Sequence, residues 1–203
     1  RDGVSDLVVA NQGSNDVSML LGVVSNDFVS FTTGPRLETG AGPVSTSLMD
    51  GNGDGINDLV VTNSEAGTVS LLPGVGGGFF NDQIPTTLNI GATSNQGGVL
   101  FNNSFVATNP LDNSVTFIRD LGDAFRTGQG IQHFSSGGLN PVFTTTTDFN
   151  FDGITDLLIA NVGDGGIALL AGDGFGFGLT DVFTADGLLH PSAIAIAAQH
   201  PSV

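Results

Sequence analysis

The sequence predicts an all-β fold built from four repeated units, and two observations carry this prediction. The composition favours short strands joined by tight turns, because 31 of the 203 residues are glycine and only 12% are charged. Helices would require more Ala, Glu, Lys and Arg. In addition, one apolar pattern recurs four times along the chain, and internal repetition at a spacing of about 50 residues is typical of repeat architectures.

Each repeat contains a short apolar strand that ends at an asparagine. These asparagines are Asn11, Asn63, Asn109 and Asn161, at spacings of 52, 46 and 52 residues. In the second repeat the strand covers residues 57–63, and a polar turn and a second apolar segment at residues 68–74 follow it. Strands this short must be buried by neighbouring units.

Two further strands complete each unit. A Gly/Phe-rich turn such as residues 76–80 precedes a third strand, and a fourth, such as residues 43–49 or 141–147, leads into the next unit. Four short strands per repeat predict the blade of a β-propeller. A β-solenoid is the main structural rival, but its coils are usually shorter.

We expect one β-propeller region over residues 1–203, with repeats at about residues 1–40, 41–90, 91–138 and 139–188. Residues 189–203 contain a further strand pattern that would complete the first blade. The chain then forms either a closed four-bladed ring or a slice of a larger propeller, and both remain open.

Two acidic loops precede the apolar strands of the second and fourth repeats. Both have the pattern D-x-N-x-D-G-x-x-D, which places side-chain oxygens at positions 1, 3, 5 and 9 and a backbone carbonyl at position 7. The predicted ligands are Asp50, Asn52, Asp54, Ile56 and Asp58 in one loop and Asp148, Asn150, Asp152, Ile154 and Asp156 in the other. Ca²⁺ takes six to eight oxygen ligands in a flexible cage, so the sequence predicts two calcium sites.

Rival interpretations of these loops are weaker. An EF-hand or a dockerin-type loop needs an acidic twelfth position beside a helix, and Val61 or Ile159 occupies that position within a β-branched run. The remaining alternative is an acidic turn in which Asp and Asn cap their own backbone.

The other two repeats differ in their loops. The first retains Asp2, Val4 and Asp6, the second half of such a loop, so we expect weaker metal binding there and a chain that is a fragment or a processed product. The third repeat has Gly98, Leu100, Asn102 and Ser104 at the ligand positions. We expect no metal in it and a short turn in place of the loop.

The acidic loop followed by Leu-Val-Val or Leu-Leu-Ile resembles the FG-GAP/VCBS repeat, which occurs in integrin α-subunit propellers and in secreted bacterial proteins. The resemblance covers essentially the whole chain. It implies that the Ca²⁺ loop lies between the first two strands of a blade and stiffens it. The Phe-Gly element of that family is only partly kept, at residues 175–178, and its Gly-Ala-Pro partner is altered to Gly40-Ala-Gly-Pro43.

Charge and composition exclude several partners. The formal net charge is −16 and the only basic side chains besides histidine are four arginines, so nucleic acid is excluded as a partner because phosphate binding needs a basic patch. No apolar run reaches the roughly 18 residues needed to cross a bilayer, so we expect no membrane insertion. The absence of cysteine excludes disulfides and thiolate metal sites.

No catalytic constellation is visible. His133, His190 and His200 do not form a metal-binding or nucleophile-activating motif, and acidic pairs such as Asp120 and Asp123 are better explained by turns. Asn102 begins an N-x-S sequon and is a possible glycosylation site.

These observations lead to a main functional hypothesis and two alternatives. The main one is a non-enzymatic extracellular Ca²⁺-binding propeller for adhesion, for binding a protein or carbohydrate ligand, or for surface assembly, in a secreted bacterial protein. The first alternative is a propeller-scaffold enzyme acting on polysaccharide, with His133 or an Asp/Arg pair at the central funnel. The second is a subunit of an extracellular fibre that self-assembles through its terminal strands.

Overall fold

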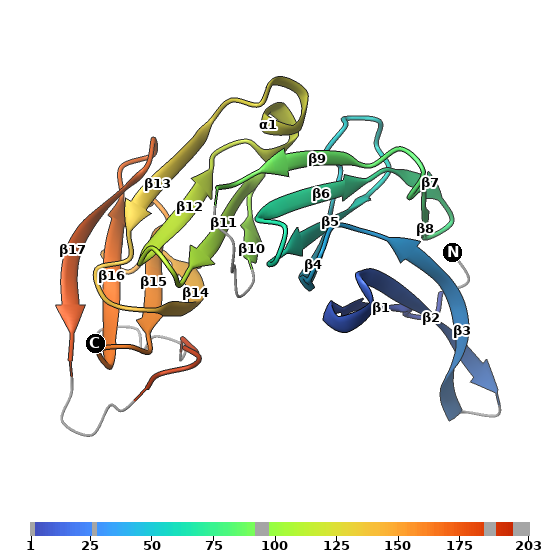
Figure 1. The fold of residues 1–203 in the computed structure, drawn as a ribbon, viewed down its shortest axis with the longest axis horizontal. Coiled ribbons are helices and arrows are strands. Elements are labelled where there is room, and N and C mark those ends of the chain that lie inside the picture. Colours follow the sequence, from blue (N-terminus) through green and yellow to red (C-terminus); the bar gives the residue numbers. More distant parts are fainter. Residues whose placement is uncertain (1–2, 26–27, 92–97, 185–189, 197–203) are drawn as a thin grey trace.

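The computed structural model describes residues 3–25, 28–91, 98–184 and 190–196. Four antiparallel sheets follow one another along the chain and form an open arc (Figure 1). Blade 1 lies at one end of this arc and blade 4 at the other. The predicted all-β architecture of four-stranded blades is therefore confirmed, whereas the sheets do not close into a four-bladed ring.

Each blade takes its strands from one repeat of the sequence. Blade 1 consists of β1 (Leu7–Asn11), β2 (Asp16–Ser25) and β3 (Phe28–Glu38). Blade 2 consists of β4 (Pro43–Met49), β5 (Asp58–Asn63), β6 (Thr68–Leu72) and β9 (Thr86–Asn89), with a small hairpin of β7 (Gly74–Gly76) and β8 (Phe79–Phe80). Blade 3 consists of β10 (Gly98–Phe101), β11 (Ser104–Asn109), β12 (Ser114–Ile118) and β13 (Ile131–Ser135). Blade 4 consists of β14 (Pro141–Thr147), β15 (Asp156–Asn161), β16 (Gly166–Gly172) and β17 (Phe177–Phe183).

The core lies between successive blades. One apolar cluster joins blades 1 and 2 and includes Met19 and Leu59, a second joins blades 2 and 3, and a third joins blades 3 and 4 through Phe117 and Leu157. Every residue of β5 and β15 is buried. Both faces of β5 are therefore covered, since Leu59 and Val61 pack against blade 1 and Val60 packs against blade 3, which explains its continuous apolar run.

The first strand of a blade lies at the inside of the arc. β10 of blade 3 contacts both β4 and β14, the first strands of the neighbouring blades, whereas β13 and β17 form the last strands of their sheets. Blades 2 to 4 each have this inner strand. Blade 1 has three strands in the described part of the chain, and β1 is its innermost.

The repeated asparagines stabilise the turn that follows the strand they end. In the first three repeats the side-chain amide donates hydrogen bonds to side-chain oxygens five and seven residues later. The pairs are Asn11 with Asp16 and Ser18, Asn63 with Thr68 and Ser70, and Asn109 with Ser114 and Thr116. In the fourth repeat these positions are Gly166 and Ala168, and Asn161 donates instead to the carbonyl oxygen of Ser136 at 3.1 Å.

Three features differ from the sequence-based expectations. Residues 190–196 form no strand, so they do not complete the first blade in this structure, and the rest of the predicted strand lies outside the described residues. A seven-residue helix, α1 (Leu121–Thr127), lies between β12 and β13. The pair Asp120 and Asp123 belongs to it, because Asp120 is its N-cap and its carboxylate accepts a hydrogen bond from the Asp123 N–H at 2.9 Å.

Candidate functional site

The two acidic loops occupy equivalent places, between β4 and β5 in blade 2 and between β14 and β15 in blade 4. In the first loop Asp50 accepts hydrogen bonds from the backbone N–H groups three, four and five residues ahead, at 2.8, 3.1 and 2.9 Å. The side-chain oxygen of Asn52 accepts the Asp54 N–H at 2.9 Å, and Asp54 accepts the Ile56 N–H at 2.8 Å. These bonds curl the loop into a tight turn.

The second loop repeats this geometry. Asp148 accepts the backbone N–H groups of Asp152 and Gly153 at 3.1 and 2.9 Å, and Asn150 accepts the Asp152 N–H at 3.0 Å. Asp152 in turn accepts the Ile154 N–H at 2.7 Å. The glycine after position 5 has a φ of 82° in the first loop and 83° in the second, a backbone conformation that favours glycine.

The aspartate at position 9 has a different role from the others. Asp58 is fully buried. One of its oxygens accepts the N–H groups of Gly51 and Asn52 at 3.0 and 3.1 Å, and the other accepts the N–H of Gly74 at 2.8 Å. Asp58 therefore links the start of the loop to the first residue of β7.

Two other blades contain the same tie. Asp156, also fully buried, accepts N–H groups from Phe149 at 2.8 Å and from Gly172 at 2.9 Å. In blade 1, Asp6 accepts the Gly22 N–H at 2.9 Å. The position-9 aspartates thus have a structural function that the ligand pattern did not reveal.

The donor chemistry of these loops suits a hard cation, since carboxylate, amide and carbonyl oxygens are the ligands that Ca²⁺ prefers. An oxygen that accepts one N–H also retains a second lone pair for a metal. Within the described residues, however, no three acidic or histidine side chains converge as a ready-made metal site. Of the shorter loop in blade 1, Val4 and Asp6 are described, while Asp2 lies outside the described residues.

In the third repeat a two-residue turn, Asn102–Asn103, replaces the loop, because Phe101 of β10 pairs directly with Ser104 of β11. Asn102 is exposed and has a φ of 47°. Its side chain is accessible for glycosylation, which stays a prediction.

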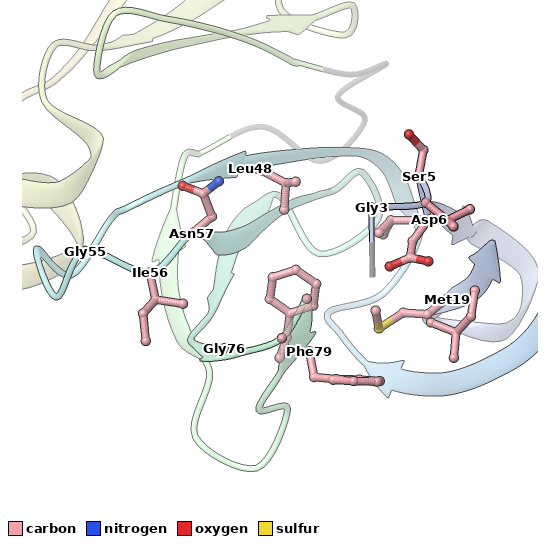
Figure 2. A pocket seen from close by; sticks show the side chains of 16 residues that line it. Gly3, Ser5, Asp6, Met19, Leu48, Gly55, Ile56, Asn57, Gly76 and Phe79 are labelled. Carbon is pink, nitrogen blue, oxygen red and sulfur yellow. The ribbon is translucent and has the colours of Figure 1, made fainter. Parts of the chain in front are cut away.

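A cavity of about 950 Å³ opens between blades 1 and 2 (Figure 2). Its apolar wall includes Met19 from blade 1 and Leu48 and Phe79 from blade 2. Asp6 and Asn57 add polar groups, and Figure 2 shows the Asp6 carboxylate on the same side as Met19. None of the lining residues in the described part of the chain is basic.

The Asp6 carboxylate is oriented by two features of this cavity. Its Oδ1 is held by the Gly22 N–H. Its Oδ2 lies toward the β7–β8 hairpin, where a Cβ built on Gly78 would be 3.6 Å away. Sequence analysis identified Asp6 only as part of a metal loop, because nothing in the local pattern shows that a hairpin from the next blade faces it.

The residues that the enzyme alternative placed at a central funnel are not at the inside of the arc. His133 lies on β13, the outermost strand of blade 3, and its Nδ1 is 3.1 Å from the Thr116 hydroxyl. The two Asp/Arg pairs of the described residues are Asp16 with Arg36 in blade 1 and Asp123 with Arg126 on α1. His190 contacts the Val162 carbonyl, and His200 lies outside the described residues.

Comparison with known proteins gives matches in structure alone. No model of a known protein family matches the chain, and no curated protein matches it. A provisionally assigned 6-phosphogluconolactonase of Bacteroides uniformis is similar with a TM-score of 0.66 and 14% identity, over 95% of this chain and 54% of that one.

Two further solved structures agree. A provisionally assigned 6-phosphogluconolactonase of Bacteroides fragilis has a TM-score of 0.62 at 19% identity, over 91% of this chain and 53% of that one. A periplasmic gluconolactonase of Pseudomonas aeruginosa has a TM-score of 0.60 at 15% identity, over 87% of this chain and 50% of that one. This chain therefore spans about half the length of each. At these identities the similarity establishes the fold.

The comparisons correct the family resemblance and the function drawn from it. The assignment to FG-GAP/VCBS repeats is wrong, since no family model matches and the three structural neighbours described above are named as lactonases. The non-enzymatic adhesion module inferred from that resemblance is corrected with it. The physical reason is that an acidic turn between two short strands is a local feature of a blade. It identifies the blade architecture, and enzymes are built on the same architecture.

In the parts of the chain that the structure describes, no helix has the length and apolar character needed to cross a membrane.

Proposed function

We propose that this chain is a lactonase-type propeller hydrolase, which opens the cyclic ester of a sugar lactone with water. The observation that supports this most is the similarity of 87–95% of the chain to three structures named as sugar lactonases. The proposal develops the enzyme alternative and replaces its polysaccharide substrate with a lactone. One of these neighbours is periplasmic, which favours a secreted or periplasmic location.

The cavity between blades 1 and 2 is the candidate site for the substrate. Its apolar wall, including Leu48 and Phe79, would pack against the C–H face of a sugar ring, and polar groups such as Asn57 would bind hydroxyls. Such a mixture of an apolar wall and a few polar groups is typical of small-molecule sites.

Asp6 is the candidate general base. Hydrolysis needs a group that removes a proton from the water that attacks the lactone carbonyl, while the ring oxygen takes up a proton as the C–O bond breaks. A carboxylate held in place by one hydrogen bond, as Asp6 is by the Gly22 N–H at 2.9 Å, can accept that proton on its other oxygen.

The charges favour a neutral lactone over a phosphorylated one. A phosphate group would enter a cavity whose described lining contains no basic side chain, in a chain with a net charge of −16. Phosphate recognition depends on Arg, Lys or clustered N–H donors. We therefore expect faster turnover of glucono-δ-lactone than of its 6-phosphate.

Lactone ring opening releases acid, so a pH-stat measures it directly above the spontaneous rate. We expect catalysis of glucono-δ-lactone hydrolysis, and an Asp6→Asn variant should lower kcat by about 10²-fold or more, the usual contribution of a general base. Asparagine keeps an acceptor for the Gly22 N–H, so the fold is preserved. Asp181→Asn, an exposed aspartate on β17, is the matched control and should leave the rate unchanged. No rate above the spontaneous one with either lactone would refute the proposal.

We also propose that the loops at residues 50–58 and 148–156 each bind Ca²⁺, through the ligands named above. The bound ion would link the half-buried carboxylate at position 1 to the exposed carboxylate at position 5, which otherwise repel each other, and so stiffen the strand connection at that edge of the blade. Support comes from the shared donor pattern and shared hydrogen-bond geometry of the two loops.

Calorimetric titration after chelation tests this. Two binding events are expected, with a rise of Tm in Ca²⁺. Asp54→Ala and Asp152→Ala should each remove one event, whereas Asp123→Ala on α1 should remove none. The absence of binding heat in the unaltered protein would contradict the calcium proposal and leave the lactonase proposal untouched.

A further inference from the structure

The acidic loop of blade 2 contains an Asn-Gly pair that the acidic loop of blade 4 lacks. Asn52 is followed by Gly53, both residues are exposed, and nothing lies within 4 Å of a Cβ built on Gly53. In blade 4 the same two positions hold Asn150 and Phe151. The difference matters because the backbone nitrogen after an asparagine can attack the asparagine side chain. A glycine leaves that nitrogen unhindered, whereas a phenylalanine shields it.

The side chain of Asn52 is folded over the backbone that follows it. Its Oδ1 accepts the N–H of Asp54 at 2.9 Å, and its Nδ2 donates to the Asp54 carboxylate at 3.0 Å. A side-chain oxygen bonded to the N–H two residues ahead forms an Asx turn, which brings Cγ of the asparagine beside the intervening nitrogen of Gly53. The two atoms that would react are therefore held close to each other by the fold of the loop.

The nitrogen of Gly53 is also bonded to a base. Its N–H donates to Oδ1 of Asp50 at 2.8 Å. In the described part of the blade 4 loop, Asp148 accepts hydrogen bonds from the two residues after Phe151 and none from the Phe151 N–H itself. The two loops thus share their pattern of acidic residues but differ at this one N–H group.

We propose that Asn52 is a self-modification site, at which the loop itself converts this asparagine to aspartate and isoaspartate. The Gly53 nitrogen attacks Cγ of Asn52 while its proton passes to Asp50, and the Asp54 N–H stabilises the negative charge that develops on Oδ1 of Asn52. The Cγ–Nδ2 bond then breaks. The amide nitrogen takes the proton from Asp50 and leaves as ammonia, and a cyclic succinimide remains.

Water completes the modification. Asn52 and Gly53 are both exposed, so solvent reaches the succinimide. Water that adds to one carbonyl carbon opens the ring to aspartate, and water that adds to the other gives isoaspartate, in which the main chain runs through the side-chain carbon. Either product adds one negative charge to a chain whose net charge is −16.

The modification would alter a loop that we propose to bind Ca²⁺. Aspartate at position 3 would replace an amide ligand with a carboxylate, whereas isoaspartate would lengthen the main chain and move the later ligand positions. Only this consequence rests on the calcium proposal. The modification itself depends on neither the calcium proposal nor the lactonase proposal, and it is tested in metal-free buffer without a lactone.

Peptide mass spectrometry of aged protein tests the proposal. The unaltered protein is incubated under native conditions and in urea, and peptide fragmentation then separates asparagine, aspartate and isoaspartate at residue 52. We expect conversion of Asn52 to be about tenfold or more faster in the native protein than in urea, because the loop supplies both proximity and a base. Asn150 is the reference in the same molecules, and its conversion should be about tenfold or more slower than that of Asn52.

The pH dependence of the rate identifies the base. In urea hydroxide must remove the proton, so the rate should rise in proportion to the hydroxide concentration. With a carboxylate as the base, the native rate should change little between about pH 6 and about pH 8, because carboxylates are already ionised in that range. This plateau is measured on the unaltered protein, so it does not depend on the folding of any variant.

Variants of the two loops complete the experiment. Asp50→Ser keeps an oxygen that can accept the Gly53 N–H but removes the base, so the rate at Asn52 should fall by about tenfold or more and should then follow hydroxide. Asp148→Ser, which removes the same charge from the loop of blade 4, is the matched control and should leave the rate at Asn52 unchanged. Two outcomes would overturn the proposal. One is a native rate no higher than the rate in urea, and the other is an Asp50→Ser variant with an unaltered rate and pH profile.

Discussion

At the scale of single residues, the asparagine at the end of each second strand has a function that the repeat pattern alone does not explain. Its amide nitrogen donates to side-chain oxygens at fixed positions in the next strand, at 3.1 and 2.9 Å for Asn63 with Thr68 and Ser70. Where Gly166 and Ala168 replace those partners, the amide of Asn161 turns to a backbone carbonyl of the preceding blade. The turn thus requires an asparagine at this position, whereas the acceptor of its hydrogen bond differs between repeats.

Removing this amide should destabilise the protein. In Asn63→Ala the buried hydroxyl of Ser70, which is 2% exposed, loses its donor, and we expect a loss of about 1–3 kcal/mol in the free energy of unfolding. Asn103→Ala, in an exposed turn with one hydrogen bond to Asp120, should cost no more than about 0.5 kcal/mol. Urea denaturation of both variants measures the difference, and equal costs would contradict the structural role of Asn63.

The turn after β16 should respond to acid. Two backbone N–H groups, those of Phe175 and Gly176, donate to Asp173 at 2.8 and 2.7 Å and lower the pKa of its carboxyl below the ordinary 3.8. Since the folded pKa is lower than the unfolded one, the stabilisation is complete above pH 3.8 and is lost as pH falls through the folded value. An NMR titration of the Asp173 carboxyl should give a midpoint below 3.8, and the protection of the Phe175 amide against exchange, relative to its intrinsic rate at each pH, should fall in acid. Asp173→Asn should abolish the pH dependence.

At the scale of elements, the strands and the acidic loops could be predicted because their signals are local. The apolar runs of β5 and β15 favour strands, and the glycine after each loop's fifth position allows the positive φ of the turn. The helix α1 was missed because its seven residues are too few for a periodic signal. The cavity beside Asp6 was missed because it forms between residues far apart in the sequence, on β1 and on the β7–β8 hairpin.

A glycine that follows β6 is required by close approach of the backbone to the acidic loop. A Cβ on Gly74 would lie 2.2 Å from the Asn57 carbonyl oxygen, and Gly22 and Gly172 have the same contact in their blades. We expect Gly74→Ala to cost about 3 kcal/mol or more, because the backbone must move. Gly53→Ala is the control. Its φ is 81° but nothing lies within 4 Å of its Cβ, so backbone strain alone should cost about 1–2 kcal/mol. Urea denaturation in metal-free buffer compares the two, and an equal or smaller cost at Gly74 would show that the approach is not tight.

At the scale of the whole molecule, the charge opposes both folding and association. The chain has a net charge of −16, and the structure describes two ion pairs, Asp16 with Arg36 and Asp123 with Arg126. Most of the described carboxylates instead accept hydrogen bonds from backbone N–H groups. These bonds hold the carboxylates in place but do not neutralise their charge. Repulsion between like charges in a compact molecule lowers its stability.

Screening this repulsion should stabilise the protein. Raising the ionic strength from about 0.01 to 0.15 M shortens the Debye length from about 30 to about 8 Å. Packed sheets lie about 10 Å apart, so the acidic loops of different blades are then separated by more than a Debye length. We expect Tm to rise with NaCl in metal-free buffer, and choline chloride at the same ionic strength should give the same rise because screening does not depend on the cation. A small addition of Ca²⁺ should then raise Tm further, at a concentration too low to screen. If Tm is insensitive to NaCl and choline chloride, the carboxylates are already neutralised by short-range contacts, and charge repulsion does not limit the stability of this propeller.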